Sequence, residues 1–490
     1  MVFNSFHLLI FLPLVTILFY LLPSRFRWML LLVASFYFYM VWEPIYILLI
    51  IFSILVDFYT GVKMGNLATK QERKPYMALS IICNLGNLTL FKYLDFFTSS
   101  INQLFQSLNM EYMLPLAHLI LPLGISFYSF QAMSYTLDVY KGKSAPERHL
   151  GIFALYITFF PQLVAGPIER AKHLIDQFHF NYKFNWNNIT SGLRLIMMGL
   201  FKKVVIADQL SSMVSHVFNN ASEAHGITVY IGCMLFAYQV YCDFSGYSDI
   251  ARGSARLLGV DLMENFKLPF FANSYSNFWS QWHISLMNWF RDYIMFPLVK
   301  MKWKWPAVFL LVFFISGLWH GANWTFVAWG IYNGLLVIYT KSTLKFRSKL
   351  LDKAGFAKFT GMRHVVQSIC VVHFFAFSAV FFRANNLSDS WILIQNLFTD
   401  FVPVLKQIAS NANNVRQDLL YVGKDAVTFY MVISFLVILE IFQWNIRKIT
   451  IDEAVNKLHP FLRYLLYTSI VMAILLMSNV AEVPFIYFQF

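Results

Sequence analysis

Two histidines occupy stretches of the chain in which their chemistry would stand out. His320 lies within residues 306–340, which contain no Asp, Glu, Lys or Arg, and His283 lies in the aromatic segment 277–293. An ionisable residue at membrane depth is by default a candidate for function. Because burial disfavours the imidazolium form, we expect His320 to be neutral and able to accept a proton, and His283 to orient it or to stabilise an oxyanion. The residues alone leave a structural role open for each histidine, as a core side chain with a hydrogen-bonded ring.

Small polar and aromatic residues near these histidines are candidates for the lining of a substrate cavity. Asn323, which follows His320 closely, could donate a hydrogen bond to a developing oxyanion. A further polar stretch, residues 241–252, lies between apolar segments, and it predicts either a cavity lining or a buried ion network. The predicted lining residues are Ser316, Trp319, Asn323, Trp282, Arg291 and Asp243.

The uncharged stretch around His320 is longer than the ~20 apolar residues that one membrane-spanning helix needs. Gly317, Gly321 and Asn323 interrupt it. Irregular backbone at membrane depth is tolerated only where it lies inside protein or lines a cavity. We therefore predict two helices that are broken beside His320 and a cavity at the break.

The composition excludes a soluble protein. Of the 490 residues, 58% are hydrophobic and 13% are charged, against about 25% charged in soluble domains. Apolar runs recur along the chain, which predicts one all-α integral-membrane domain over residues 1–490, a polytopic transmembrane helical bundle of about 11 spans. We expect a re-entrant hairpin near Pro161 and a proline-kinked span over residues 114–139.

The distribution of Lys and Arg predicts the orientation of the spans. Loops 63–74 and 341–363 are basic, which places them in the cytoplasm by the positive-inside rule, with loop 385–423 and the N-terminus external. The net charge of +13 comes from such short loops and not from a basic stripe, so we expect no nucleic-acid partner. The four cysteines have no paired spacing, so we expect neither disulfides nor a metal site.

Five segments, in this order and spacing, carry a resemblance to a known family: PQLVAGPIER, YCDFSGYSDIARG, FWSQWHISLMNWFRDY, ISGLWHGANWTF and VFFRANN. Over nearly its whole length the chain resembles the membrane-bound O-acyltransferase (MBOAT) family, and most of all its bacterial AlgI and DltB branch. The resemblance implies an all-helical MBOAT fold with re-entrant or broken helices and a central funnel or tunnel. It also implies that His320 is the catalytic residue and that His283 is the second histidine of a pair across the tunnel.

The C-terminal residues 483–490, VPFIYFQF, form an uncharged aromatic tail. This ending resembles the terminal tyrosine motif of bacterial polymer-acylation systems, which implies that Tyr487 is a transient acyl carrier. A phenol, whose pKa is near 10, accepts an acyl group once a base has removed its proton. The alternative is that the tail only packs against the helical bundle.

The resemblance implies an acyltransferase that moves an acyl group, by expectation acetyl from acetyl-CoA, across the membrane for O-acylation of an extracytoplasmic polysaccharide. His320 would act as general base, with no metal and no permanently bound cofactor. We expect a bacterial inner or plasma membrane location, contact with membrane lipid, and an extracytoplasmic SGNH hydrolase-like partner. Two alternatives stay open: D-alanyl transfer from a carrier protein to teichoic acid, and a secondary transporter, although the sequence shows no paired repeats or coupling-ion ligands.

Overall fold

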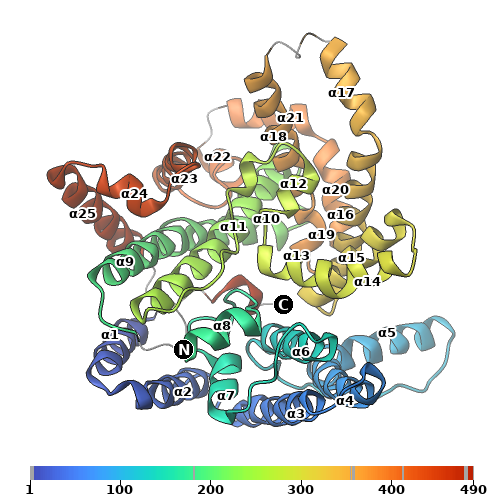
Figure 1. Cartoon of the computed structure of the whole chain (residues 1–490). Helices are drawn as coiled ribbons and strands as arrows, with labels where there is room; N and C mark the ends of the chain where they lie inside the picture. Colours follow the sequence, from blue (N-terminus) through green and yellow to red (C-terminus); the bar gives the residue numbers. More distant parts are fainter. Residues whose placement is uncertain are drawn as a thin grey trace. The chain divides into compact units, whose positions relative to one another are not determined.

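The computed structural model of the chain describes residues 5–179, 182–353, 355, 359–410, 413–478 and 484–488. All regular elements among these residues are helices (Figure 1). The chain divides into two compact units, one made of Met1–Ile196 with Ser248–Glu264 and the other of Met197–Tyr247 with Asn265–Phe490. Each unit combines segments that are distant in the sequence. The single domain expected over residues 1–490 stays a prediction.

The first unit is built mainly from helices in the N-terminal part of the chain. Two helices, α9 (Trp186–Leu200) and α11 (Ile227–Leu257), run from one unit into the other. The remaining helices of the first unit are α1 (Phe6–Leu21), α2 (Ser24–Met40), α3 (Ile47–Gly65), α4 (Lys70–Leu88), α5 (Leu94–Ser107), α6 (Ile125–Lys141), α7 (Leu150–Thr158) and α8 (Ala171–Phe178), with a 3-10 turn η1 (Pro44–Tyr46) and a π-helical segment η2 (Thr89–Tyr93).

The second unit contains the broken stretch around His320 and the C-terminal tail. Its short 3-10 and π-helical segments are η3 (Phe201–Ala207), η4 (Pro269–Phe271), η5 (Arg291–Met295) and η6 (Ile486–Phe488). Its α-helices are α10 (Asp208–Phe218), α12 (Tyr275–Trp279), α13 (Ile284–Phe290), α14 (Phe296–Lys300), α15 (Trp305–His320), α16 (Trp324–Ser342), α17 (Leu344–Lys353), α18 (Thr360–Phe377), α19 (Ala379–Phe382), α20 (Leu387–Phe398), α21 (Phe401–Ala409), α22 (Asn413–Leu419), α23 (Ala426–Ile446), α24 (Ile451–Asn456) and α25 (Pro460–Met477).

Polar side chains mark the beginnings of several apolar helices. Ser5 accepts a hydrogen bond from the first turn of α1, and Asp425 does the same for α23. At α4, Thr69 and Glu72 form a capping box in which each side chain accepts from the other residue's backbone N–H. These caps satisfy N–H groups that have no partner within the helix.

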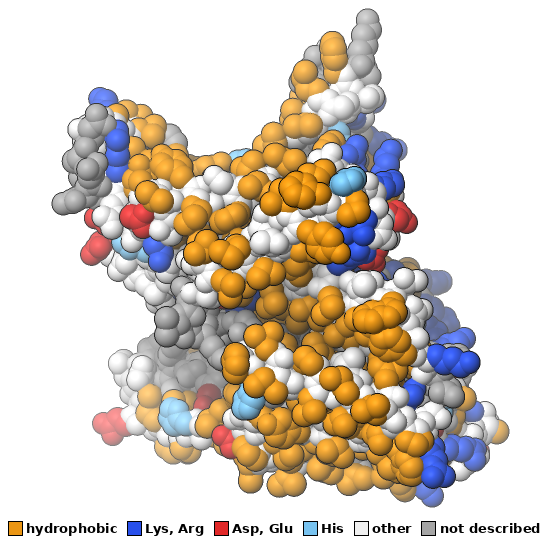
Figure 2. All heavy atoms as spheres, turned by 90° about the vertical axis from the view of Figure 1, so that its left-hand side faces the viewer, with side chains coloured by type: hydrophobic (Ala, Val, Ile, Leu, Met, Phe, Trp, Pro, Cys, Tyr) orange, Lys and Arg blue, Asp and Glu red, His pale blue; other side chains and the backbone are white. Residues whose placement is uncertain are grey.

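Six helical segments among the described residues are long and apolar enough to cross a membrane: Pro44–Gly65, Lys70–Ser107, Ile227–Leu257, Thr360–Phe382, Ala426–Ile446 and Pro460–Met477. Helices α1 and α15 are apolar but shorter. Figure 2 shows hydrophobic side chains spread over much of one face of the molecule, as expected of surface that contacts lipid. The total of about 11 spans stays a prediction.

The proline-kinked span expected over residues 114–139 is wrong in its first half. Helix α6 begins only at Ile125, and the residues before it are not helical. Side chains of α5 hold that irregular backbone: the Asp95 carboxylate accepts the N–H groups of Ala117 at 2.8 Å and His118 at 2.9 Å. The polar groups of the backbone are thereby satisfied without a helix, which is the condition for such a segment in a membrane protein.

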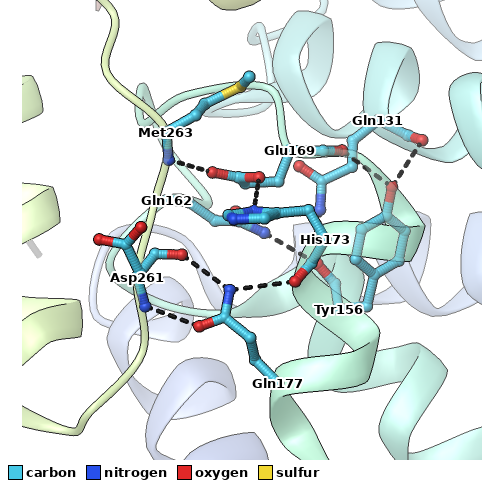
Figure 3. A network of polar contacts seen from close by, with 8 residues as sticks. All are labelled: Gln131, Tyr156, Gln162, Glu169, His173, Gln177, Asp261 and Met263. Atoms are coloured by element: carbon cyan, nitrogen blue, oxygen red, sulfur yellow. Dashed lines mark hydrogen bonds and ion pairs between the residues drawn. The ribbon is translucent and has the colours of Figure 1, made fainter.

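The motif segment 161–170 folds in the first unit as a buried turn after α7, near the position of the expected re-entrant hairpin (Figure 3). Its Glu169 side chain is fully buried. The carboxylate accepts the Met263 N–H at 2.5 Å and lies 2.8 Å from His173 Nδ1, and the Glu169 carbonyl accepts the Tyr156 hydroxyl at 3.1 Å. A buried carboxylate held by several donors fastens the turn to its neighbours.

Candidate active site

The stretch around His320 is broken as predicted, with α15 ending at His320 and α16 beginning at Trp324. Asn323 begins α16, because its Oδ1 accepts the Thr325 N–H at 3.0 Å. Its Nδ2 donates to the Asn385 carbonyl at 3.3 Å. The Asn323 amide therefore has a capping role at the break.

Two glycines allow α15 and α16 to pack with their backbones in contact. A Cβ atom at Gly317 would lie 2.2 Å from the carbonyl oxygen of Phe326, and one at Gly330 would lie 2.4 Å from that of Phe313. Neither distance is possible for a real side chain, so only glycine fits at these positions. Small residues that let membrane helices approach closely are typical of such interfaces. The two contacts fix His320 relative to α16.

His320 is buried, with 5% of its surface exposed, and aromatic rings surround it. Its ring centroid lies 4.9 Å from that of Trp329 and 5.2 Å from that of Phe382. The centroid distance is 5.1 Å to Trp319 and 5.5 Å to Tyr487. The structure thus brings the predicted base and the predicted carrier into ring contact.

His283 lies immediately before α13 in the left-handed backbone region, with φ 44°. Non-glycine residues rarely adopt this conformation, and it persists where the surroundings enforce it. Here Asn265 holds the following turn: its carbonyl accepts the Ile284 N–H at 2.9 Å and its Oδ1 accepts the Ser285 N–H at 3.1 Å. Burial lowers the pKa of His283 to about 3, so its ring is neutral at physiological pH.

Trp319 connects the two histidines. Its ring centroid lies 5.6 Å from that of His283 and 5.1 Å from that of His320, and 6.1 Å from that of Tyr487. The His283 ring also packs edge-on against Phe244, with the ring centroids 4.6 Å apart. His283 therefore reaches the His320 site through one indole ring, which suits an orienting role.

A small cavity opens beside His320. Its walls are mostly aromatic, and the polar groups of the described residues in its lining are one imidazole, one phenol, one hydroxyl and two indoles. Such a cavity can hold a small acyl group away from water next to a base. The described residues that line it are Phe236, Val240, Trp282, His320, Trp329, Phe375, Ser378, Phe382 and Tyr487.

The C-terminal tail enters the core of the second unit. Phe485 and Ile486 are buried. The Phe485 ring stacks on Tyr487 at 5.3 Å and lies 4.7 Å from Tyr247. Tyr487 also contacts Phe244 at 4.9 Å. Burial raises the pKa of the Tyr487 phenol, so its proton leaves only if a nearby base takes it.

The remaining predicted residues differ in their distance from this cavity. Trp282 lines it and packs against Phe375 at 4.7 Å. Ser316 is buried one helical turn before His320 on α15. Arg291 lies at the surface, where its Nε donates to the neighbouring aspartate at 2.9 Å and its side chain is 46% exposed. Of the six predicted lining residues only Trp282 is among the described residues that line the cavity; the other five are not: Ser316, Trp319, Asn323, Arg291 and Asp243.

Asp243 lies in an ion cluster beneath the tail. Its carboxylate lies 2.8 Å from Lys203 Nζ, which also lies 2.7 Å from Asp208. Lys203 and Asp208 were not predicted as site residues. A charged side chain such as Lys203 inside the apolar run that ends at Ile206 is a signal for a functional residue, and Asp208 follows that run directly. Phe375 was not predicted either, because nothing in the sequence separates one buried phenylalanine from another.

Within the part of the chain that the structure describes, no three His, Cys, Asp or Glu side chains lie together in a way that could hold a metal ion. The chemistry available at the cavity is proton transfer by an imidazole to or from a phenol.

Known proteins resemble this chain over most of its length. The "Probable alginate O-acetylase AlgI" of Azotobacter vinelandii is 35% identical over 404 residues, which cover 81% of this chain and 78% of that protein. This chain belongs to the membrane-bound O-acyltransferase family. The MBOAT family model matches residues 149–382, which include His283 and His320 and leave Tyr487 outside.

The names of two further relatives refer to other polymers. The peptidoglycan O-acetyltransferase of Helicobacter pylori is 32% identical over 400 residues, 75% of this chain and 73% of that protein. The teichoic acid D-alanyltransferase of Bacillus subtilis is 28% identical over 237 residues, 46% of this chain and 60% of that protein. Membership confirms the predicted family, the all-helical multi-pass fold and the acyltransferase activity of this MBOAT, and it sets aside the secondary transporter.

Proposed function

We propose that this MBOAT transfers an acetyl group from a cytoplasmic thioester, acetyl-CoA, first to Tyr487 and then towards an extracytoplasmic polysaccharide. The observation that carries the proposal is the ring contact of Tyr487 with His320, 5.5 Å between centroids, in the wall of one cavity. The names of the relatives support O-acetylation of a polymer, alginate in one case and peptidoglycan in another. The small aromatic cavity supports a short acyl group.

The first transfer is a nucleophilic substitution at the thioester carbonyl. His320 takes the phenolic proton of Tyr487, and the phenolate oxygen attacks the carbonyl carbon. The tetrahedral intermediate collapses when its carbon–sulfur bond breaks, and the leaving thiolate receives the proton from His320. The products are a free thiol and an aryl acetate on Tyr487, which is still activated for a second transfer.

His283 and Trp319 support this step without taking part in covalent chemistry. His283 is neutral, so one of its ring nitrogens carries a proton that can be donated. Through Trp319 it fixes the orientation of the His320 ring, or it stabilises the oxyanion of the intermediate. Either role lowers the free-energy barrier of the chemical step and leaves the affinity for the donor unchanged.

In the second transfer a hydroxyl of the polysaccharide attacks the acetyl carbonyl of the Tyr487 ester. The aryl ester bond breaks, the acetyl group forms a new ester on the polysaccharide, and the Tyr487 phenolate takes up the proton that the hydroxyl has lost. We propose that an extracytoplasmic SGNH hydrolase-like protein completes this transfer, because the acceptor is on the far side of the membrane from the donor. We propose that the protein lies in the bacterial inner or plasma membrane, surrounded by lipid, with its N-terminus external, and the distribution of Lys and Arg between the spans supports this orientation.

Mass spectrometry of the full-length protein tests the carrier role. Wild-type protein incubated with acetyl-CoA should gain an alkali-labile acetyl group on its C-terminal peptide, and Tyr487→Phe and His320→Ala should gain none. Tyr464→Phe is the matched control, because this tyrosine on α25 is 69% exposed and should not affect the adduct. Phe fills nearly the same volume as Tyr, so loss of transfer in Tyr487→Phe reports the missing oxygen and not lost packing.

The same variants, assayed also for polymer acetylation, separate the alternatives. Polymer acetylation at the wild-type rate by Tyr487→Phe would refute the carrier role and leave His320 as the candidate base. A D-alanyl adduct, formed from an aminoacylated carrier protein and not from acetyl-CoA, would replace the proposed donor and acceptor by those of the teichoic acid relative.

A further inference from the structure

A buried ion cluster lies under the C-terminal tail. It consists of Lys203, Asp208 and Asp243, and each of these side chains is at most 7% exposed. The Lys203 ammonium lies 2.7 Å from Asp208 and 2.8 Å from Asp243. One ammonium thus faces two carboxyl groups within the cluster. A buried charge is destabilising unless further donors satisfy it.

The tail supplies such a donor. The backbone N–H of Ile486 donates to Oδ2 of Asp243 at 2.7 Å, while Oδ1 of the same carboxylate faces Lys203. The Ile486 side chain is 1% exposed, so water does not compete for this bond. Hydrogen bonds to an ionised acceptor are about twice as strong as neutral ones.

The helix that carries Asp243 also holds the rings on either side of Ile486. On α11, Phe244 contacts Tyr487 at 4.9 Å and Phe485 at 5.6 Å. The backbone bond therefore sits between two aromatic contacts on one helix. Together they determine the depth at which the tail enters the unit and the register of its side chains.

The residues that follow Lys203 in the same helix also contact the last span. Lys203 lies in the π-helical segment η3, a form that recurs at functional sites. Shortly after it, Gln209 Nε2 donates to the carbonyl of Met477, the last residue of α25, at 2.7 Å. The helix formed by η3 and α10 thus contacts the end of α25 directly and the tail through Asp243.

We infer that Asp243, held by Lys203 and Asp208, docks the C-terminal tail through the Ile486 amide and so sets Tyr487 against His320. Asp243 is a positioning residue for the tail and does not line the path of the substrate. The inference rests on the proposed function only in that the docked tyrosine is the one that carries the acyl group.

The test changes each partner of the bond in the full-length protein. Asp243→Asn removes the charge and keeps the shape. Ile486→Pro removes the N–H, and because Ile486 is the first residue of a 3-10 turn, proline fits the backbone there. Ile486→Val is the matched control, since it keeps the N–H and has a volume close to that of proline.

Two readouts follow these variants. Carboxypeptidase digestion measures docking without any chemistry, and the acetyl adduct on Tyr487 measures positioning. The loss of a hydrogen bond to a charged group should expose the tail to digestion and lower the rate of adduct formation by about tenfold or more in Asp243→Asn and in Ile486→Pro. Ile486→Val should behave as wild type. The double variant should be no worse than the more impaired single one, because both remove one interaction.

Each outcome decides a different statement. A tail that stays protected in both Asp243→Asn and Ile486→Pro overturns the docking site. A released tail with an unchanged adduct rate overturns the positioning role. A released tail in these variants, together with normal polymer acetylation by Tyr487→Phe, upholds docking and overturns only the carrier function. If Asp243→Asn fails to fold, Ile486→Pro still gives the answer, because it leaves the ion cluster intact.

Discussion

Substitution of Gly317 by alanine should disable the enzyme although it removes no polar group. A Cβ atom there would lie 2.2 Å from the carbonyl oxygen and 3.1 Å from the carbonyl carbon of Phe326, which are backbone atoms and cannot rotate away. The two helices must therefore separate. We expect a loss of about 1–3 kcal/mol of stability from overpacking. Because His320 ends the same helix, a displacement on the order of 1 Å should lower acyl transfer by about a hundredfold.

Thermal unfolding in detergent and the rate of adduct formation on Tyr487 measure the two effects. Gly86→Ala is the matched control, since it is also a helical glycine and its Cβ would meet nothing within 4 Å. This variant should keep its activity and gain up to ~1 kcal/mol from the lower entropy of the unfolded chain. Wild-type melting and transfer by Gly317→Ala would refute the close backbone contact as the device that places His320.

Three further predictions concern the site and the orientation of the chain. His283→Gln should lower kcat more than it raises KM, and an effect confined to KM would return the residue to a structural role. Because burial lowers the pKa of His283 to about 3, its ring is already neutral, and the pH profile of the variant near neutrality should keep the wild-type shape. Val240→Ala shortens a side chain in the cavity wall and should raise the rate of adduct formation with a propionyl donor, relative to the rate with an acetyl donor, by about tenfold or more. An unchanged ratio of the two rates would mean that the cavity does not hold the acyl group. Cysteines introduced into loops 63–74 and 341–363 should be protected from impermeant reagents in intact cells, and those in loop 385–423 should be labelled; outside labelling of loop 63–74 would reverse the orientation.

The break beside His320 could be predicted because its causes are local. A long uncharged stretch interrupted by Gly317, Gly321 and Asn323 has few other ways to satisfy its backbone. His320 could be singled out by the same scarcity of charge, whereas His283 was predicted from its aromatic segment and from the resemblance to the MBOAT family. The non-helical residues before Ile125 could not be predicted, because their hydrogen bonds come from Asp95 and other side chains of α5.

The pairing within the ion cluster could not be predicted from the sequence for a different reason. Lys203 and Asp243 are far apart in the chain, and their pairing depends on how η3 packs against α11. An isolated Asp243 in a polar motif is equally consistent with a cavity wall. The tail bond adds a backbone N–H, which any residue but proline supplies and which no residue pattern marks.

The contact between His320 and Tyr487 has a consequence for stoichiometry. The proposed carrier and its base belong to one polypeptide, so their encounter is intramolecular and does not weaken on dilution. Each chain can then hold at most one acyl equivalent in transit. A burst of donor cleavage in the absence of acceptor should equal the molar amount of enzyme, and the steady rate should be limited by how fast that single tyrosine is emptied on the other side of the membrane.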